Sequence, residues 1–214
     1  MPKVDVFEEN SVAYEAWFDR NPFAYQSEFR AIRELLPEKG RGVEIGVGSG
    51  QFAKPLGIEI GIEPLFKMAE LARAKGIHVI DAVAESLPFD DHEFDFALMV
   101  TTICFVDDPV LAFNEIRRIL KPGGDILIGF VDRESDLGQQ YFTSREQSQF
   151  YKDATFFSIN DVLDLLRQSG FDSFQFRQTL FCRDLSEITD VEEPTTGTGQ
   201  GAFMVVKAKA MEIS

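Results

Sequence analysis

The sequence predicts an α/β fold in which a parallel β-sheet carries helices on both faces. Apolar strand-like segments alternate with amphipathic helical segments through the first 131 residues, an alternation typical of a parallel sheet. The segment 94–100 is apolar almost throughout, as expected of a strand buried on both faces. With 214 residues, 44% of them hydrophobic, the chain is long enough for a full core, and we expect residues 1–214 to form a single domain.

The N-terminal part of the chain carries helical signals over residues 11–36. Apolar side chains recur there with helical spacing, and Ser11 is a candidate N-cap. The pair Asn21-Pro22 is expected to divide this stretch into two helices, because proline does not continue a helix. Residues 37–40, which begin with proline and end with glycine, are expected to terminate the second helix.

Five strands are expected before residue 132, with helices or turns between them. The expected strands are 42–45, 58–62, 78–80, 94–100 and 126–130, and the longer helices are 65–75 and 109–120. Only a short or irregular helix fits between the first two strands, because residues 51–57 include Pro55. The turn at 121–124 is expected to end the helix that precedes the fifth strand.

Beyond residue 132 the pattern loosens. Residues 132–157 are polar and aromatic, with no clear period. A helix is expected over about 160–169, followed by strand-like runs at 174–181 and 202–206 with a long polar loop between them. No internal repeat or linker interrupts the chain, which is consistent with a single domain.

The charge of the chain argues against a polyanionic partner. Its net charge is −15, from 36 acidic and 21 basic side chains, and such a field repels nucleic acid. The densest basic cluster, Arg117, Arg118 and Lys121, is interpreted as the solvated end of one helix. No apolar run approaches the length of a membrane span, and residues 1–6 are too acidic and interrupted for a secretory signal. We therefore expect no nucleic-acid or membrane partner and a cytoplasmic location.

The cysteines and histidines do not form a metal-binding pattern. Cys104 and Cys182 are far apart, there is no Cys-x-x-Cys motif, and His78 and His92 lie in unrelated surroundings. The two cysteines are expected to be free packing residues, because a disulfide is unusual in the cytoplasm. No metal site is expected.

The sharpest feature of the sequence is a glycine-rich turn after the first strand. It is Glu44-Ile45-Gly46-Val47-Gly48-Ser49-Gly50, with glycine at alternate positions. Glycine allows backbone angles and close approaches that a Cβ atom would block, so a ligand can lie against the main chain. The dinucleotide-binding formula Gly-x-Gly-x-x-Gly/Ala fits when counted from Gly48, which makes Ala53 the third small residue. This motif alone therefore leaves a nicotinamide cofactor open.

Two motifs carry a resemblance to a known family. Residues 43–50 resemble the first motif of the class I S-adenosylmethionine-dependent methyltransferases. Gly61-Ile62-Glu63-Pro64 resembles the second motif, in which an acidic residue at the end of the second strand takes the ribose hydroxyls. A different role for Glu63, a carboxylate that stabilises the start of the next helix, is compatible with the first.

Two further segments extend this resemblance. Residues 84–89, followed by Phe94-Asp95, resemble the third region of the family, which implies that Ala84 and Glu85 lie beside the adenine. Without the other motifs this segment would be interpreted as a surface turn with a hydrophobic plug. Residues 115–124 match the helix and turn before the fifth strand, a match that indicates the fold more than the chemistry. The resemblance assigns these residues to the cofactor site: Glu44, Gly46, Val47, Gly48, Gly50, Glu63, Pro64, Ala84, Glu85 and Thr101.

The resemblance is clear over about 14–129, weak to residue 207, and nearest to the small-molecule branch that includes ubiquinone-biosynthesis-type enzymes. It implies a Rossmann-like, doubly wound, seven-stranded sheet whose last strand is antiparallel, with 174–181 and 202–206 as the closing hairpin. We accordingly divide the expected domain into three parts. These are an N-terminal helical cap segment (1–37), a cofactor-binding core (41–131), and an acceptor-side region with the closing hairpin (132–214).

The resemblance implies an enzyme that uses S-adenosylmethionine and releases S-adenosylhomocysteine. Methyl transfer to a nitrogen or oxygen of a small molecule would follow by in-line displacement, in which positioning can supply ~7–11 kcal/mol. A general base is needed only when the attacking atom carries a proton that must leave early. No catalytic residue is assigned, because Cys104-Phe105 stands where many relatives have histidine, and His78 and His92 are interpreted as packing and loop residues.

Acceptor contacts are expected from the N-terminal segment and from the region after the fifth strand. Tyr14 and Trp17 are candidates to close over the cofactor. The candidates to line an acceptor pocket are Asp132, Arg133, Gln139, Tyr141 and Tyr151. Aromatic rings with acidic neighbours suit a cationic or amine acceptor through cation–π contacts. The alternative is that Trp17 and other aromatic residues are simply core.

Three other functions stay open from the sequence. The first is an NAD(P)-dependent oxidoreductase of related fold, which NAD would stabilise and S-adenosylhomocysteine would not. The second is an aminopropyl transferase, although the acidic active-site motifs usual in such enzymes are not found. The third is a non-catalytic regulatory protein that binds the cofactor, which methyl transfer to any acceptor would exclude.

Overall fold

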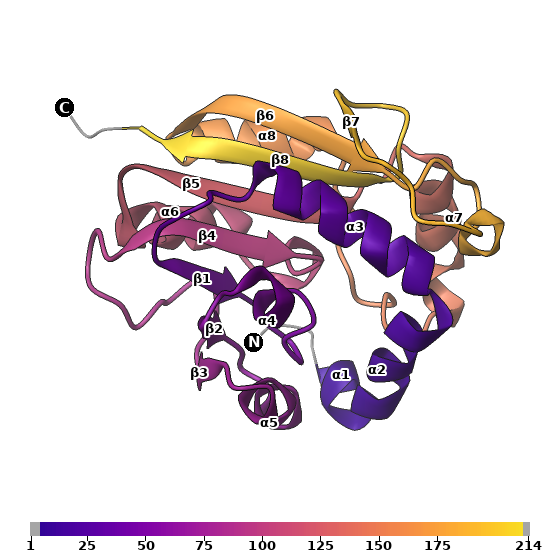
Figure 1. The fold of residues 1–214 in the computed structure, drawn as a ribbon, viewed down its shortest axis with the longest axis horizontal. Helices are drawn as coiled ribbons and strands as arrows, with labels where there is room; N and C mark the ends of the chain where they lie inside the picture. The colour runs from indigo at the N-terminus through magenta and orange to yellow at the C-terminus, as the bar shows by residue number, and fades with distance from the viewer. Residues whose placement is uncertain (1–4, 212–214) are drawn as a thin grey trace.

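The computed structural model describes residues 5–211, in which an eight-stranded β-sheet lies between helices on its two faces (Figure 1). The strands are β1 (Gly42–Ile45), β2 (Ile60–Ile62), β3 (His78–Ile80), β4 (Phe94–Val100), β5 (Leu120–Val131), β6 (Phe171–Thr179), β7 (Thr195–Thr196) and β8 (Phe203–Ala210). Their order in the sheet is β3-β2-β1-β4-β5-β8-β6-β7. Strands β1 to β5 are parallel, and β8 is antiparallel to both β5 and β6. Residues 1–4 lie outside the described residues; they belong to the segment 1–6 that was predicted not to be a secretory signal.

The expected count of seven strands is wrong, because the polar loop after β6 contributes an eighth. Strand β7 consists of two threonines, which pair antiparallel with Arg177 and Gln178 of β6. A segment this short and polar shows no alternation of apolar and polar side chains, and it becomes a strand only because β6 offers an unpaired edge. The closing hairpin of β6 and β8 and the antiparallel last strand are confirmed, and the paired segments are longer than expected.

The helices are α1 (Asp5–Glu9), α2 (Ser11–Arg20), α3 (Pro22–Leu35), α4 (Ala53–Leu56), α5 (Phe66–Ala74), α6 (Pro109–Ile119), α7 (Asp136–Ser144) and α8 (Ile159–Gln168), with short 3₁₀ turns η1 (Ile103–Phe105), η2 (Arg145–Gln147) and η3 (Leu185–Glu187). The break at Pro22 and the short first crossover helix are confirmed. The expected N-cap role of Ser11 is wrong, because α1 directly precedes α2 and leaves Asn10 in the cap position. Among the described residues no helix is long and apolar enough to cross a membrane.

The turn at 121–124 belongs to β5 as a bulge and does not simply precede the strand. Leu120 pairs with Phe94 and Asp125 with Phe96, so the extra residues on β5 bulge out of the ladder. A Cβ atom on Gly124 would lie 2.9 Å from the carbonyl oxygen of Lys121 and 3.0 Å from that of Asp95. This close backbone approach explains the glycine at the bulge.

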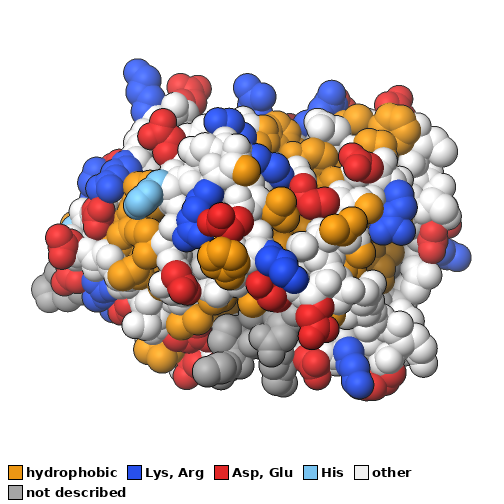
Figure 2. Space-filling model, turned by 90° about the horizontal axis from the view of Figure 1, so that it is seen from below, with side chains coloured by type: hydrophobic (Ala, Val, Ile, Leu, Met, Phe, Trp, Pro, Cys, Tyr) orange, Lys and Arg blue, Asp and Glu red, His pale blue; other side chains and the backbone are white. Residues whose placement is uncertain are grey.

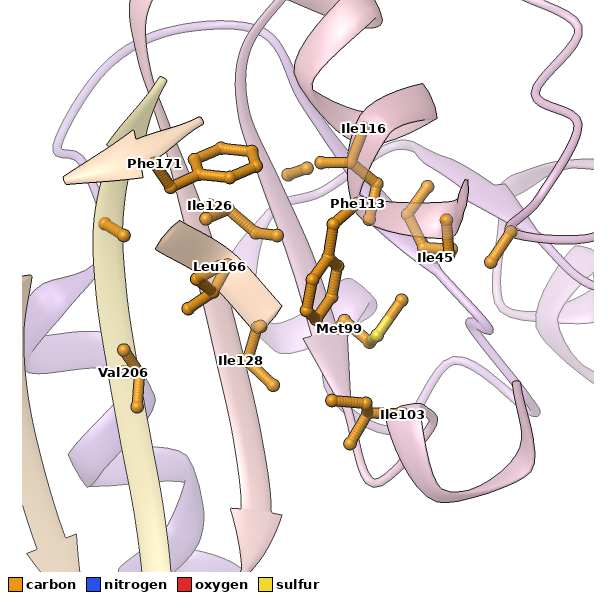
Figure 3. Packing of buried hydrophobic residues seen from close by; sticks show 14 of the residues in the cluster. Ile45, Met99, Ile103, Phe113, Ile116, Ile126, Ile128, Leu166, Phe171 and Val206 are labelled. Atoms are coloured by element: carbon orange, nitrogen blue, oxygen red, sulfur yellow. The ribbon is translucent and has the colours of Figure 1, made fainter. Parts of the chain in front are cut away.

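Two apolar clusters cover the two faces of the sheet. Figure 3 shows the first, in which Phe113 and Ile116 of α6 and Leu166 of α8 pack on side chains of the central strands. The second cluster places α3 and α5 on the opposite face, with Phe203 of β8 among its members. Successive residues of β8 alternate between the two clusters, as the period of two along a strand requires.

The order of the strands determines where a ligand site can form. β1 has β2 on one side and β4 on the other, so the chain crosses over in opposite directions from this point. In open α/β sheets, a crevice forms at the carboxyl ends of the strands where the winding reverses. The turn 46–50 follows β1 and therefore lies at that position.

Candidate functional site

A cavity opens at the carboxyl ends of β1, β2 and β4, and we call it the first cavity. It lies between the glycine-rich turn, the start of α5, the loop 82–85 and the segment after β4. Seven of the ten residues assigned to the cofactor site by resemblance line it. They are Gly46, Gly48, Glu63, Pro64, Ala84, Glu85 and Thr101.

The glycine-rich turn presents its main chain to the first cavity. The backbone N–H groups of Gly46 and Val47 both donate to the carbonyl of Ile62 at 2.9 Å, which ties the turn to β2. Gly46 and Gly48 have φ values of 71° and 53°, a region that favours glycine. A Cβ atom on Gly46 would lie 2.3 Å from the side chain of Thr102, so a larger residue does not fit without displacement.

Glu63 is a buried carboxylate held by the main chain. Its residue is 7% exposed, its Oε2 accepts the N–H of Gly48 at 2.9 Å, and its Oε1 accepts the N–H of Leu65 at 3.0 Å. Burial raises the pKa of Glu63 to about 7, and the two N–H groups act in the opposite direction. Each oxygen retains a lone pair, so the carboxylate can accept further hydrogen bonds from a ligand in the first cavity.

Three residues assigned to the cofactor site do not line the first cavity. Glu44 is 2% exposed beneath the turn, its Oε2 has no partner, and burial raises its pKa well above the usual range. Val47 packs beneath the turn, where a Cβ atom on Gly61 would lie 2.6 Å from its side chain. A Cβ atom on Gly50 would lie 2.4 Å from Ile77, so this glycine makes room for packing. The structure therefore places Glu44 and Val47 beneath the turn and Gly50 against Ile77, so that all three support the turn and do not line the first cavity.

The segments after β3 and β4 close the other side of the first cavity. The carboxylate of Glu85 accepts the backbone N–H groups of Asp107 and Asp108 at 2.8 and 3.2 Å, which joins the two loops. Thr101 has a φ of 49°, unusual for a β-branched residue, and its N–H donates to the carbonyl of Gly129 at 2.7 Å. Among the described residues that line the first cavity, Glu63 and Glu85 carry charge and no basic side chain occurs.

A second cavity adjoins the first, and Tyr14 and Thr101 line both. Its walls are mainly aromatic and aliphatic, and one wall residue is acidic: Tyr14, Trp17, Phe18, Glu28, Phe52, Thr101, Val131, Leu137, Tyr141, Leu180 and Leu185. The ring of Phe18 packs edge-on against Tyr14 at 5.3 Å and against Trp17 at 5.1 Å, centroid to centroid.

The structure brings some of the predicted acceptor residues together. Tyr14, Trp17 and Tyr141 line the second cavity. Tyr151 stacks on Tyr141 at 5.4 Å and on Phe105 at 6.3 Å, so it supports the wall from behind. Because Phe105 lines the first cavity, these stacked rings connect the two cavities.

Asp132, Arg133 and Gln139 are not brought to the second cavity. Asp132 is 3% exposed, and it borders a separate polar pocket next to residues 198–202. The guanidinium of Arg133 donates to the carbonyl of Phe156 at 3.0 Å and pairs with Asp161, while Gln139 donates to the carbonyl of Arg133 at 2.7 Å. Helix α7, which the sequence pattern does not predict, carries Gln139 on an exposed face and presents Leu137 and Tyr141 to the second cavity.

Sequence reasoning missed Glu28, the acidic residue of the second cavity. It lies on the buried face of α3, with Ala24 and Ile32 one turn away on either side. A charged residue on the apolar face of an amphipathic helix is a signal visible in the sequence. Phe18 and Phe52 carried no comparable signal, because aromatic residues are usual in a core.

Comparisons with known proteins show that the chain is similar to methyltransferases. Residues 43–128 match the family model described as a methyltransferase domain. A crystal structure from Thermotoga maritima, of a protein described as a SAM-dependent methyltransferase and possible histamine N-methyltransferase, is 51% identical with a TM-score of 0.93, covering 96% of this chain and 98% of that one. A Methanocaldococcus jannaschii protein is 42% identical over 206 residues, covering 96% of this chain and 99% of its own length. A demethylmenaquinone methyltransferase from Staphylococcus haemolyticus is 27% identical over 141 residues, 55% of this chain and 59% of its own length.

Proposed function

The chain belongs to the class I S-adenosylmethionine-dependent methyltransferases, and on that premise we propose that it methylates a nitrogen or oxygen atom of a small molecule held in the second cavity. The cofactor is S-adenosylmethionine. The observation that carries the proposal is that the two cavities adjoin and share Tyr14 and Thr101. When bound, the cofactor supplies an electrophilic methyl group on a positively charged sulfur.

The residues of the first cavity fit this cofactor. A carboxylate is a good acceptor for a pair of ribose hydroxyls, and Glu63 is held in place for that role by two main-chain N–H groups. The main chain of Gly46 and Gly48 leaves the space that a side chain would fill. Ala84 and Glu85 line the first cavity, and we expect them to contact the edge of the adenine ring. The described lining carries no basic side chain to repel a sulfonium.

Several observations support a small acceptor. The second cavity is lined mainly by aromatic and aliphatic side chains, as small-molecule sites usually are. The net charge of −15 disfavours nucleic acid, and on the face drawn in Figure 2 acidic and basic side chains are interspersed. The compounds in the names of two relatives, histamine and demethylmenaquinone, are both small molecules. A single domain over residues 1–214, a cytoplasmic location and the absence of nucleic-acid and membrane partners belong to the same proposal.

The contribution of the chain to the reaction is to position and enclose the reactants. Aromatic walls around the second cavity exclude water from the acceptor, and the shared residues bring the acceptor next to the first cavity. Holding two reactants in line can lower a barrier by ~7–11 kcal/mol, which is sufficient for a reaction whose leaving group needs no activation.

Thermal shift of the full chain with S-adenosylhomocysteine and with NAD tests the cofactor site. We expect stabilisation by S-adenosylhomocysteine at micromolar concentration and none by NAD. Transfer of a labelled methyl group should then appear in the low-mass fraction of a metabolite extract, and not in added RNA or protein. Labelling of RNA or protein alone would contradict a small-molecule acceptor.

A further inference from the structure

The side chain of Glu28 lies in the wall of the second cavity and is almost fully enclosed. The residue is 5% exposed, and Ala24, Ala31 and Ile32, which lie about one turn away on the same face of α3, are apolar. Leu137 and Tyr141 of α7 line the same cavity from the acceptor-side region. A carboxylate in such surroundings is expected to have a partner, because burying an unpaired charge is costly.

Glu28 has no such partner among the residues that the structure describes. Four other acidic residues are buried in the described part of the chain, and each has a partner. Glu63 accepts hydrogen bonds from two backbone N–H groups, and Asp125 forms ion pairs with Lys207 and Lys209. Asp132 accepts a hydrogen bond from the backbone N–H of Glu134, and Glu44 accepts one from that of Ala53. No hydrogen bond or ion pair among residues 6–211 reaches the Glu28 carboxylate. Its missing partner therefore points to a ligand that brings donors or positive charge.

The aromatic side chains of the same cavity favour the same class of ligand. Tyr14, Trp17, Phe18, Phe52 and Tyr141 all line it. Aromatic faces attract cations, and the attraction is greatest where water is excluded. A carboxylate without a partner, enclosed by rings, is complementary to an ammonium group on an apolar body. A carboxylic acid or phosphate ester would instead meet a like charge and no described basic side chain in the wall.

We propose that the second cavity binds an amine, whose protonated amino group donates hydrogen bonds to the carboxylate of Glu28 while its apolar part packs on the surrounding rings. This inference rests on the proposed function, since it names the acceptor class for the same site. It makes Glu28 the residue that selects amines over alcohols and acids.

Glu28 is also suited to take a proton from the bound amine. Burial raises the pKa of Glu28 to about 8, close to the range in which an ammonium group releases its proton. Binding of the ammonium group favours the ionised form of Glu28, which first releases its own proton to solvent. Transfer of one proton from the ammonium nitrogen to a Glu28 oxygen then leaves a neutral amine with a free lone pair and a neutral carboxyl group. The proton later leaves Glu28 to solvent, so the charge balance is complete without another base.

Calorimetric titration of the full chain, saturated with S-adenosylhomocysteine, tests this inference with three probes of one shape. The probes are 2-phenylethylamine, 2-phenylethanol and 3-phenylpropanoate. We expect the amine to bind at least tenfold more tightly than the alcohol, and the acid not to bind. Glu28→Gln should reduce amine binding to the level of the alcohol, with S-adenosylhomocysteine binding changed less than twofold.

Glu34→Gln is the matched control, because it makes the same substitution on the same helix at a residue that pairs with Arg177 outside the cavity. It should leave all titrations unchanged. Amine binding that is absent, that equals alcohol binding, or that survives Glu28→Gln would overturn the inference while leaving the proposed function in place. Failure to bind S-adenosylhomocysteine would instead count against the proposed function. The comparison of amine with alcohol needs no variant, so it decides the matter even if Glu28→Gln does not fold.

Discussion

The two adjoining cavities each contain a buried glutamate, and the two carboxylates are held in opposite ways. In the first cavity, Glu63 accepts N–H groups from Gly48 and Leu65 at 2.9 and 3.0 Å, so the main chain itself orients it. In the second cavity, Glu28 receives no hydrogen bond from the described residues, and rings and aliphatic side chains surround it. The pKa of both is raised by burial, to about 7 and about 8.

If the two cavities are the cofactor and acceptor sites proposed above, this difference lets one fold combine a fixed cofactor site with an adaptable acceptor site. Main-chain donors depend only on the backbone path, so the first cavity can persist while side chains around it change. The second cavity is built from side chains, and its chemistry depends on one unpaired carboxylate. Burying a carboxyl group without a partner costs stability in the absence of ligand once the pH is high enough to ionise it, a cost common at functional sites.

The largest expected effect tests whether Glu28 is unpaired in the ligand-free protein. The folded chain keeps a proton on Glu28 up to about pH 8, whereas the unfolded carboxyl group loses it near 4.5, so stability falls as the pH rises between these values. Glu28→Gln should remove this loss and raise the free energy of unfolding by about 2–5 kcal/mol at pH 9. Urea unfolding of both proteins at pH 5, 7 and 9 measures it. If Glu28→Gln and the unsubstituted protein differ in free energy of unfolding by the same amount at pH 5 and at pH 9, the interpretation is wrong. Glu34→Gln serves as the control.

The next effect concerns the carboxylate of the first cavity. Glu63→Gln should weaken S-adenosylhomocysteine binding by about 10- to 100-fold, because hydrogen bonds to a charged group contribute ~1.5–3 kcal/mol. Isothermal titration measures this change. Glu59→Gln, at an exposed position just before β2, is the control and should bind normally. Normal binding by Glu63→Gln would show that the site assignment is wrong.

A smaller effect tests the wall that the two cavities share. Tyr14→Ala should weaken binding of both S-adenosylhomocysteine and 2-phenylethylamine by roughly 3- to 10-fold, because an aromatic contact contributes ~0.5–1.5 kcal/mol. Tyr14→Phe keeps the ring and should therefore keep most of the affinity for both ligands. Loss of one ligand without the other would indicate that Tyr14 belongs to one cavity only.

The smallest effect concerns a residue that the sequence assigns to the acceptor and the structure places elsewhere. Gln139 is exposed, and its side chain donates to the carbonyl of Arg133. Gln139→Ala should change amine affinity less than twofold and stability by no more than ~0.5 kcal/mol. A tenfold loss of amine binding would mean that α7 is arranged differently in the complex.

Most strands of the parallel half of the sheet are predictable from the sequence, whereas the acceptor-side region is not. Strands β1, β3 and β4 lie within the expected ranges, because each is a short apolar run between turn residues. The segment that forms α7 has no clear period in the sequence. Gly138 within it is required by the tertiary structure, because a Cβ atom there would lie 2.0 Å from the carbonyl oxygen of Asp132. The two-residue strand β7 depends on the free edge of β6.

The sequence by itself determined the proposed cofactor site, because a turn rich in glycine and a carboxylate after the next strand are local features of the chain. Only the tertiary structure decided the proposed acceptor site. Glu28, Thr101 and Tyr141 come from α3, the segment after β4 and α7, and they meet only because α3 packs across β5, β6 and β8. Local periodicity indicates that a side chain of α3 is buried, but which distant side chains surround it depends on long-range packing.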